Sequence, residues 1–231
     1  MITVAAIYVA KGGAYWNIPG VDPWDESRDA RKYDGPHPVV AHPPCSRWCR
    51  LAGLVQARWG YKKGDDGGCF AAALASVRKW GGVLEHPAYS DAFAKFDLPI
   101  PRPGGWQRGL CGGWSCHVEQ WHYGHKAKKA TWLYAFGASH LPSLVWGATP
   151  DTAAPAYVTD GGGDMKRRRV TAFCEGQNAR KANAKRARAN VSWCGNHVKD
   201  GEDRERPGKK AANATPPAFR DLLLSIARSC R

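Results

Sequence analysis

The sequence has no long uninterrupted apolar segment. Its longest apolar runs, such as Phe70–Val77, are short and are bounded by charged residues. A helix that crosses a bilayer needs about 20 predominantly apolar residues, so the sequence predicts no membrane span and no membrane partner. The first residues, Ile2–Val9, are apolar but follow no basic segment. We therefore expect them to form a first β-strand, not a signal peptide.

Paired cysteine motifs are also missing. The eight cysteines are scattered through the chain without the spacing of a small disulfide-bonded scaffold, which favours a reduced, cytoplasmic setting with thiols available for chemistry. Cysteine and histidine approach each other at Cys111, at Cys116–His117, and at Cys194 and His197. None of these groups has the Cys-x-x-Cys spacing of a structural zinc site, so we predict no bound metal.

Acidic residues are few relative to basic ones. The chain has 34 Lys and Arg residues against 20 Asp and Glu residues, a net charge of +14. Such a surplus favours a polyanionic partner, above all nucleic acid, although some basic proteins are simply soluble basic proteins. The surplus is concentrated in residues 164–210, which carry 14 basic and six acidic side chains and few large apolar ones.

What the sequence does contain is an alternation of strand and helix patterns. Val39–Ala41 is an apolar strand bounded by prolines, and Val83–Glu85 is a second one. Between them, Cys69–Trp80 is an alanine-rich amphipathic segment that predicts a helix. Strand, helix and strand in this order predict a βαβ unit and a mostly parallel sheet.

Further elements follow the same reasoning. Gly20–Asp25 predicts a short strand that ends in a turn, and Leu98–Gly113, rich in Pro, Gly and Trp, predicts irregular structure. His117–Gln120 and Thr131–Phe136 predict a hairpin, and Pro216–Arg228 predicts a final amphipathic helix. We therefore divide the chain into a catalytic α/β core (1–147), a basic, partly irregular insertion (148–210) and a C-terminal helix that returns to the core (211–231).

Cys45 is the first candidate for chemistry. It follows the strand Val39–Ala41 and two prolines, which hold it at the carboxyl edge of the sheet. Glu85 ends the next parallel strand, so its carboxyl group is expected at the same edge. His42 and His86 flank these two motifs and are candidates for handling protons, with structural hydrogen bonding as the alternative. A buried, inert cysteine and an exposed strand-end glutamate are the alternatives for Cys45 and Glu85.

Four segments occur in the order known from one enzyme family. They are Pro43-Pro44-Cys45, Glu85-His86-Pro87, the stretch Tyr123–Tyr134, and Asn213-Ala214-Thr215-Pro216-Pro217. With this order the chain resembles the DNA cytosine carbon-5 methyltransferases, and more closely a group of short phage and prophage proteins that are reduced versions of them. The resemblance spans roughly residues 39–227.

The resemblance implies a fold, a reaction and a cofactor. The fold is a reduced, Rossmann-like methyltransferase-type sheet, mostly parallel, with helices on both faces and a small basic insertion. The reaction is methyl transfer from S-adenosyl-L-methionine to cytosine in DNA, in the cytoplasm of a phage-infected or lysogenic bacterium. Cys45 corresponds to the nucleophile and Glu85 to the acid. The cofactor-binding positions implied are Gly12, Gly13, Asp22, Asp25, Asp29, Pro43 and Asn213.

The chemistry of the pyrimidine ring explains these residue types. Carbon 5 is not nucleophilic until a thiolate adds to carbon 6, and a carboxylic acid at nitrogen 3 stabilises the charge that develops. A base in a duplex would have to flip into the site. Backbone phosphates would be bound by basic side chains, for which a purely solvated role is the alternative. These candidates are Arg47, Lys126, Lys128, Lys129, Arg167, Arg168 and Arg169.

Two other functions remain open. A related carbon-5 transferase could use the same thiol addition with another donor or with a nucleotide substrate. A degenerate methyltransferase fold could instead serve as a DNA-binding protein without activity. Cys45 and Glu85 together favour an enzyme, whereas the poorly developed glycine loop at Gly12 and Gly13 favours the alternatives.

Overall fold

The computed structural model describes residues 2–102, 104–125, 128–145 and 213–230, and the backbone of two short strands at 157–159 and 196–198. The chain divides into two compact units. The first comprises residues 1–118, 131–147 and 215–231, and the second comprises 119–130 and 148–214. The predicted core, 1–147, thus includes one segment, 119–130, that groups with the second unit. Of the basic stretch 164–210, only 196–198 lies within the described residues.

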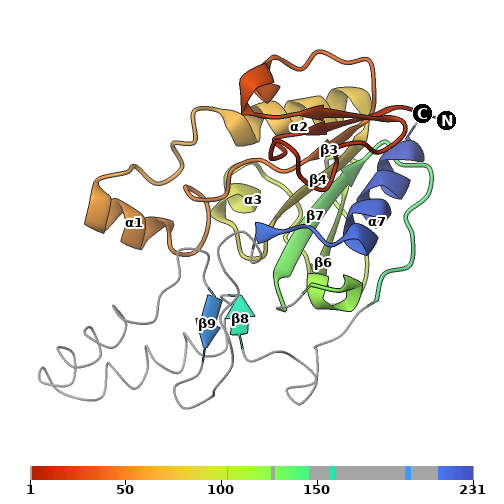
Figure 1. Ribbon diagram of the computed structural model, residues 1–231. Coiled ribbons are helices and arrows are strands. Elements are labelled where there is room, and N and C mark those ends of the chain that lie inside the picture. Colours follow the sequence, from red (N-terminus) through yellow and green to blue (C-terminus); the bar gives the residue numbers. More distant parts are fainter. Residues whose placement is uncertain are drawn as a thin grey trace, which may run out of the picture. The chain divides into compact units, whose positions relative to one another are not determined.

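A seven-stranded sheet organises the first unit (Figure 1). Its order is β2-β1-β3-β4-β7-β6-β5. The strands are β1 (Val4–Ile7), β2 (Val21–Trp24), β3 (Val39–Ala41), β4 (Gly82–Pro87), β5 (Gln107–Arg108), β6 (Trp114–Glu119) and β7 (Ala130–Phe136). β1 runs parallel to β2 and β3, and β3 runs parallel to β4. β7 joins β4 in the antiparallel direction, and β5 pairs antiparallel with β6. The predicted α/β class is confirmed, with a mixed sheet whose first four strands are parallel.

Two helices cover the sheet. α2 (Cys69–Trp80) packs against β3 and β4, and α7 (Pro217–Arg228) packs against β1, β3 and β4. Every residue of β1 and β3 is buried, which requires cover on both faces because side chains alternate along a strand. Figure 1 accordingly shows α2 behind the parallel strands and α7 in front of them. The predicted unit of strand, helix and strand is therefore confirmed as β3, α2 and β4.

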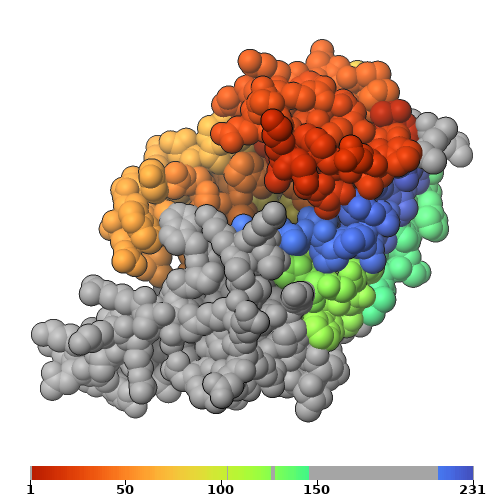
Figure 2. All heavy atoms as spheres, in the orientation of Figure 1, coloured from red at the N-terminus to blue at the C-terminus, as the bar shows by residue number. Residues whose placement is uncertain are grey.

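The C-terminal helix holds the N-terminal loops in place. Arg220 of α7 donates a hydrogen bond to the Ala14 carbonyl at 3.1 Å, and Arg228 donates one to the Pro19 carbonyl at 3.3 Å. In the space-filling view the first residues and α7 lie directly against each other (Figure 2). The apolar side of α7, which includes the buried Phe219, Leu223 and Ile226, faces the sheet. The loop after β1 is thus fixed by the far end of the chain.

The remaining described elements are short. They are α1 (Ala52–Trp59), α3 (Asp91–Lys95) and the 3-10 helices η1 (Glu26–Arg28), η2 (Ala30–Lys32) and η3 (Gln120–Tyr123). In the second unit, β8 (Tyr157–Thr159) pairs antiparallel with β9 (Asn196–Val198). None of the helices in the described ranges is long and apolar enough to cross a membrane.

Candidate functional site

The site forms where the parallel strands β1 and β3 end beside β4. In the register of the sheet, Ile7 of β1 pairs with Ala41 of β3, and Ala41 pairs with Leu84 of β4. His42 is the first residue after β3, and the register brings it beside Glu85 of β4. The prediction that Glu85 ends its strand is wrong, because β4 continues along β7 to Pro87. The chain also reverses its winding here, because β2 lies on one side of β1 and β3 on the other. Open α/β sheets bind ligands at such a switch point.

His42 connects Glu85 to a buried tyrosine. His42 Nδ1 lies 2.9 Å from Glu85 Oε2, and His42 Nε2 lies 2.8 Å from the Tyr15 hydroxyl. Only 14% of the His42 side chain and 13% of the Glu85 side chain are exposed, so water screens this contact weakly. Tyr15 is almost completely buried. The three side chains form one hydrogen-bonded row, Tyr15-His42-Glu85, along the end of the sheet.

Burial and charge determine the state of the tyrosine in this row. Burial raises the pKa of Tyr15 well above its usual value, and the negative charge of Glu85 raises it further. The positive charge of Arg220 opposes the shift and the charge of Asp221 adds to it. Tyr15 therefore stays protonated at every physiological pH.

Cys45 lies three residues beyond His42 in a tight turn. Pro43 is buried, Pro44 is exposed, and Cys45 is half-buried and forms no disulfide. The Cys45 carbonyl accepts hydrogen bonds from the backbone N–H groups of Trp48 and Cys49, both at 2.9 Å. These bonds close the turn directly after the two prolines. The predicted nucleophile is thus held in a rigid loop at the same sheet edge as His42 and Glu85.

Trp48 anchors the Cys45 loop to the helix behind it. Its ring is buried, and its indole N–H donates to Asp66 Oδ2 at 2.8 Å. Asp66 also accepts hydrogen bonds from the backbone N–H groups of Gly68 and Phe70, at the start of α2. One carboxylate therefore caps α2 and fixes the Cys45 loop.

His86 has different surroundings from His42. It is fully buried, and its ring packs edge-to-face on Phe70 with 5.2 Å between the ring centroids. Burial lowers the pKa of His86 to about 4, while the Glu85 charge and the Pro44 backbone oppose the shift. His86 is therefore neutral at physiological pH and belongs to the core beneath the Cys45 loop. Because consecutive strand residues point to opposite faces, it does not join the Tyr15-His42-Glu85 row.

The glycine loop after β1 forms a turn. Gly13 N–H bonds to the Ala10 carbonyl at 2.9 Å, and a Cβ on Gly13 would stand only 2.9 Å from that oxygen. Gly12 has a positive φ of 65°, and no atom lies within 4 Å of where its Cβ would be. Gly13 thus serves the turn itself, whereas Gly12 borders open space.

The three aspartates predicted for the cofactor have different partners. Asp22 Oδ2 accepts a hydrogen bond from the Trp24 indole at 2.8 Å, and Asp22 also pairs with Arg28. Burial opposes ionisation, but these bonds outweigh it and lower the pKa of Asp22. Asp25, at the carboxyl end of β2, accepts bonds from Ser27 through one oxygen, Oδ1. Asp25 is buried, with 8% of the residue exposed, and its other carboxylate oxygen takes no part in these bonds.

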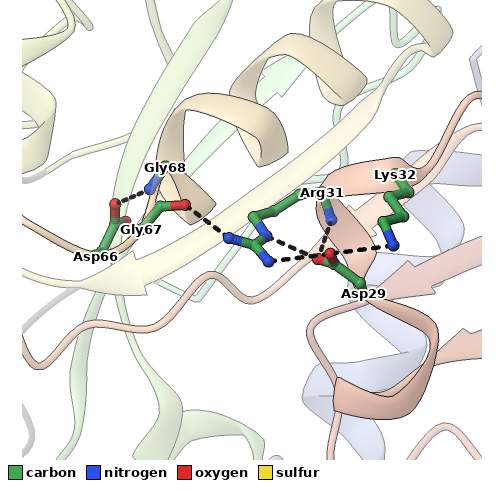
Figure 3. A network of polar contacts seen from close by, with 6 residues as sticks. All are labelled: Asp29, Arg31, Lys32, Asp66, Gly67 and Gly68. Carbon is green, nitrogen blue, oxygen red and sulfur yellow. Dashed lines mark hydrogen bonds and ion pairs between the residues drawn. The ribbon is translucent and has the colours of Figure 1, made fainter.

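Asp29 takes part in a polar network that supports α2 (Figure 3). Arg31 binds both of its carboxylate oxygens, from Nε at 2.7 Å and from Nη2 at 3.0 Å. The same guanidinium donates to the Gly67 carbonyl at 3.1 Å, next to the Asp66 cap. The hydrogen bonds from Arg31 lower the pKa of Asp29. Its carboxylate is thus engaged in holding the loop before α2.

Three arginines that follow the Cys45 turn in the chain each lie over an aromatic ring. The Arg47 guanidinium lies over the Tyr61 ring at 4.0 Å, that of Arg50 over Tyr89 at 5.3 Å, and that of Arg58 over Trp59 at 4.7 Å. Between 44% and 50% of each aromatic residue is exposed. We call these six residues the arginine–aromatic surface. Residues 46–64 include five basic side chains and no acidic one.

The other predicted DNA-binding residues lie outside the first unit. Lys128 and Lys129 belong to the second unit, where Lys129 Nζ donates to the Ala214 carbonyl at 3.0 Å. Asn213, predicted for the cofactor, is exposed and also belongs to the second unit. Lys126, Arg167, Arg168 and Arg169 lie outside the described residues. Among the described residues, no three His, Cys, Asp or Glu side chains gather as ligands of a metal ion would.

Two features of the candidate site were not predicted from the sequence. Tyr15 lies in a loop between strands and belongs to no motif, so no sequence signal marks it. The arginine–aromatic surface can be recognised in the sequence, because basic and aromatic residues are interspersed from Arg47 to Lys63.

Comparison of the chain with protein-family models, with curated proteins and with solved structures finds no match. The fold and the site thus define an α/β protein with a cysteine, a histidine and a glutamate at one sheet edge.

Proposed function

We propose that this protein modifies carbon 5 of a pyrimidine in DNA through a covalent adduct on Cys45, with methylation of cytosine as the most direct form. One observation carries the proposal. The 2.9 Å contact between His42 and Glu85 joins the first residue after β3 to the neighbouring strand β4, and the Cys45 turn follows His42 after two prolines. A thiol and a carboxyl group at one sheet edge are what conjugate addition to a pyrimidine requires.

Each residue would have a defined part in the reaction. The Cys45 thiolate forms a bond to carbon 6 of the ring, and the electron pair of the broken double bond makes carbon 5 nucleophilic. Glu85, with His42 behind it, provides the proton that neutralises the charge at ring nitrogen 3. Loss of the carbon-5 proton after transfer restores the double bond and expels the thiolate. Arg47 and Arg50, close to Cys45 in the chain, supply the positive potential that favours the thiolate.

The fit of S-adenosylmethionine depends on two residues of this chain. Gly12 borders open space after β1, and Asp25 stands at the end of the neighbouring strand β2. At Gly12 the cofactor could approach the backbone closely, because glycine has no side chain. The Asp25 carboxylate could accept hydrogen bonds from the hydroxyl groups of the cofactor's ribose. When bound, it would supply an electrophilic methyl group. The sheet, in which β7 runs antiparallel beside the four parallel strands, also suits a reduced methyltransferase-type fold.

A related transferase with another donor is the second candidate. It is favoured by the pairing of two of the three candidate aspartates, because Asp22 is engaged with Trp24 and Arg28 and Asp29 with Arg31. A donor without a ribose would need neither carboxylate. The thiol addition and the part of Glu85 would be unchanged.

DNA as the partner is supported by charge and by aromatic side chains. The net charge is +14, and the arginine–aromatic surface begins two residues after Cys45. Arginines bind phosphates, and exposed aromatic rings stack on bases that are not in a duplex. A base delivered to Cys45 would have its neighbours along this surface.

Trapping of the adduct tests the proposal. The protein is incubated with DNA that contains 5-fluorocytosine and with S-adenosylmethionine, denatured, and analysed by mass spectrometry. We expect a covalent protein–DNA species in the natural protein, none in Cys45→Ala, and an undiminished yield in Cys49→Ala, which removes a half-buried thiol of the same turn.

The three functions give different results in this experiment. An adduct that requires S-adenosylmethionine supports methyl transfer. One that forms equally well without it supports the second candidate. Absence of any adduct on duplex and on single-stranded DNA, with DNA binding retained, would show that the protein binds DNA without this chemistry.

A further inference from the structure

Tyr15 is the buried end of the row that leads to Glu85, and its hydroxyl group contacts His42. Within the described part of the chain, His42 Nε2 is the partner given by geometry, at 2.8 Å. Only 2% of Tyr15 is exposed, so water does not offer an alternative acceptor. Burial holds the pKa of Tyr15 far above neutrality, so the hydroxyl remains a donor.

The direction of this bond determines the state of His42. If the Tyr15 hydroxyl donates, Nε2 must accept and therefore carries no proton. The proton of the neutral ring then sits on Nδ1 and points to Glu85 Oε2 at 2.9 Å. A carboxylate that accepts this bond is stabilised in its ionised form.

In the other states of the row, the buried hydroxyl proton of Tyr15 has no second acceptor among the described residues. If His42 were doubly protonated, Nε2–H would face the Tyr15 oxygen, and the hydroxyl proton would have to turn away from His42. The same holds if the proton moves to Glu85 and the ring changes its tautomer. An unsatisfied buried donor is costly, so Tyr15 opposes the uptake of a second proton by the His42–Glu85 pair.

We propose that Tyr15 is a positioning residue that keeps His42 neutral, with its Nδ1–H on Glu85, and so sets the pH at which the His42–Glu85 pair gains the proton that the reaction uses. Only the last part rests on the proposed function. Among the described residues, the charged groups that act on Tyr15 are Glu85 of the row itself and Arg220 and Asp221 of α7; Glu85 and Asp221 raise the pKa of Tyr15 and Arg220 lowers it. These hydrogen bonds are present in the protein without any bound ligand.

Nuclear magnetic resonance of the histidine rings tests the proposal in the protein without substrate. In the natural protein near neutral pH, we expect His42 to show a protonated Nδ1 and an unprotonated Nε2, and the Tyr15 hydroxyl proton to exchange slowly with water. In Tyr15→Phe, a hydrogen bond to the neutral form is lost. The titration midpoint of His42 should then rise by about one pH unit.

Tyr33→Phe is the matched control. Tyr33 is also buried, but its hydroxyl donates to the His37 carbonyl at 2.7 Å and has no part in the row. This variant should leave the His42 midpoint unchanged. A protonated Nε2 in the natural protein would overturn the proposal, and so would an unchanged His42 midpoint in folded Tyr15→Phe. If Tyr15→Phe fails to fold, the proposal is still tested in the natural protein by the tautomer of His42 and by the exchange rate of the Tyr15 hydroxyl proton.

Activity gives a separate readout. If the pair must hold a proton for the reaction, the alkaline limb of the pH profile for adduct formation should move to higher pH in Tyr15→Phe, in step with the His42 midpoint. A protein that forms no adduct but shows the expected His42 state would refute the proposed function and leave the role of Tyr15 standing.

Discussion

At the scale of single residues, Glu85 and His86 show how one step along a strand separates two roles. Glu85 contacts His42 at the sheet edge, whereas His86 packs on Phe70 in the core. The alternation of side chains along β4 causes this difference.

Glu85→Gln should slow adduct formation by about a hundredfold or more, because a general acid contributes on that order. Glutamine keeps the size of the side chain and can still bond to His42, so the fold should be retained. The rate of adduct formation with 5-fluorocytosine DNA measures the effect, and Glu26→Gln, at an exposed carboxylate, is the control. A rate within twofold of the natural protein would remove Glu85 from the mechanism.

His86 should make the protein less stable in mild acid. Its pKa is about 4 when folded and about 6.5 when unfolded, so the unfolded chain binds more protons as the pH falls below 6.5. Stability is therefore lost between these values, by roughly 3 kcal/mol at pH 4. Urea unfolding at a series of pH values measures the loss. His86→Phe should flatten this dependence, whereas His140→Phe, at an exposed position, should not.

At the scale of elements, the strand β4 begins with a glycine that no other residue can replace. A Cβ on Gly82 would stand 1.9 Å from the Val39 carbonyl oxygen, and its φ is 134°. The close approach of β3 and β4 depends on this position, and with it the register that brings His42 beside Glu85.

Gly82→Ala should therefore destabilise the protein by at least about 2 kcal/mol, since both a clash with backbone and a strained dihedral result. Gly53→Ala is the matched control. Gly53 lies within α1, and nothing lies within 4 Å of where its Cβ would be, so alanine should stabilise that helix by about 0.5–1 kcal/mol. Chemical unfolding of the two variants measures both effects. A Gly82→Ala protein as stable as the natural one would contradict the geometry of the strand pair.

The elements that the sequence predicted are those with a strong apolar pattern. α2 was predicted with the bounds it has, Cys69–Trp80, and the final helix begins one residue later than expected, at Pro217. α1 was missed because Gly53 and exposed apolar residues such as Leu54 interrupt any amphipathic pattern. Of the candidate site, only the residues at or near the ends of predicted strands, such as His42 and Glu85, could be predicted. Tyr15 could not be found, since its place depends on α7 fixing the loop after β1 from the far end of the chain.

At the scale of the whole molecule, positive charge is present in both parts of the chain. Residues 164–210 carry a surplus of eight positive charges, and the Cys45 exit, residues 46–64, carries five more without any acid. Residues 46–64 also include the exposed aromatic residues Trp59 and Tyr61, each beneath an arginine. Charge alone binds any polyanion, whereas stacking discriminates between an unpaired strand and a duplex.

The arginine–aromatic surface should therefore distinguish single-stranded from duplex DNA. Removing one stacking ring in Tyr61→Leu should weaken binding of a single-stranded oligonucleotide by roughly tenfold, because stacking contributes about 1–3 kcal/mol per base. Duplex binding should change little.

Arg47→Ala should weaken the binding of both single-stranded and duplex DNA. It should also reduce the slope of log affinity against log salt by about one, as expected for a phosphate contact. Fluorescence anisotropy over a range of salt concentrations measures these effects, with Arg102→Ala, at an exposed basic residue outside this surface, as the control. Equal losses for single strand and duplex in Tyr61→Leu would mean that the surface acts through charge and shape alone.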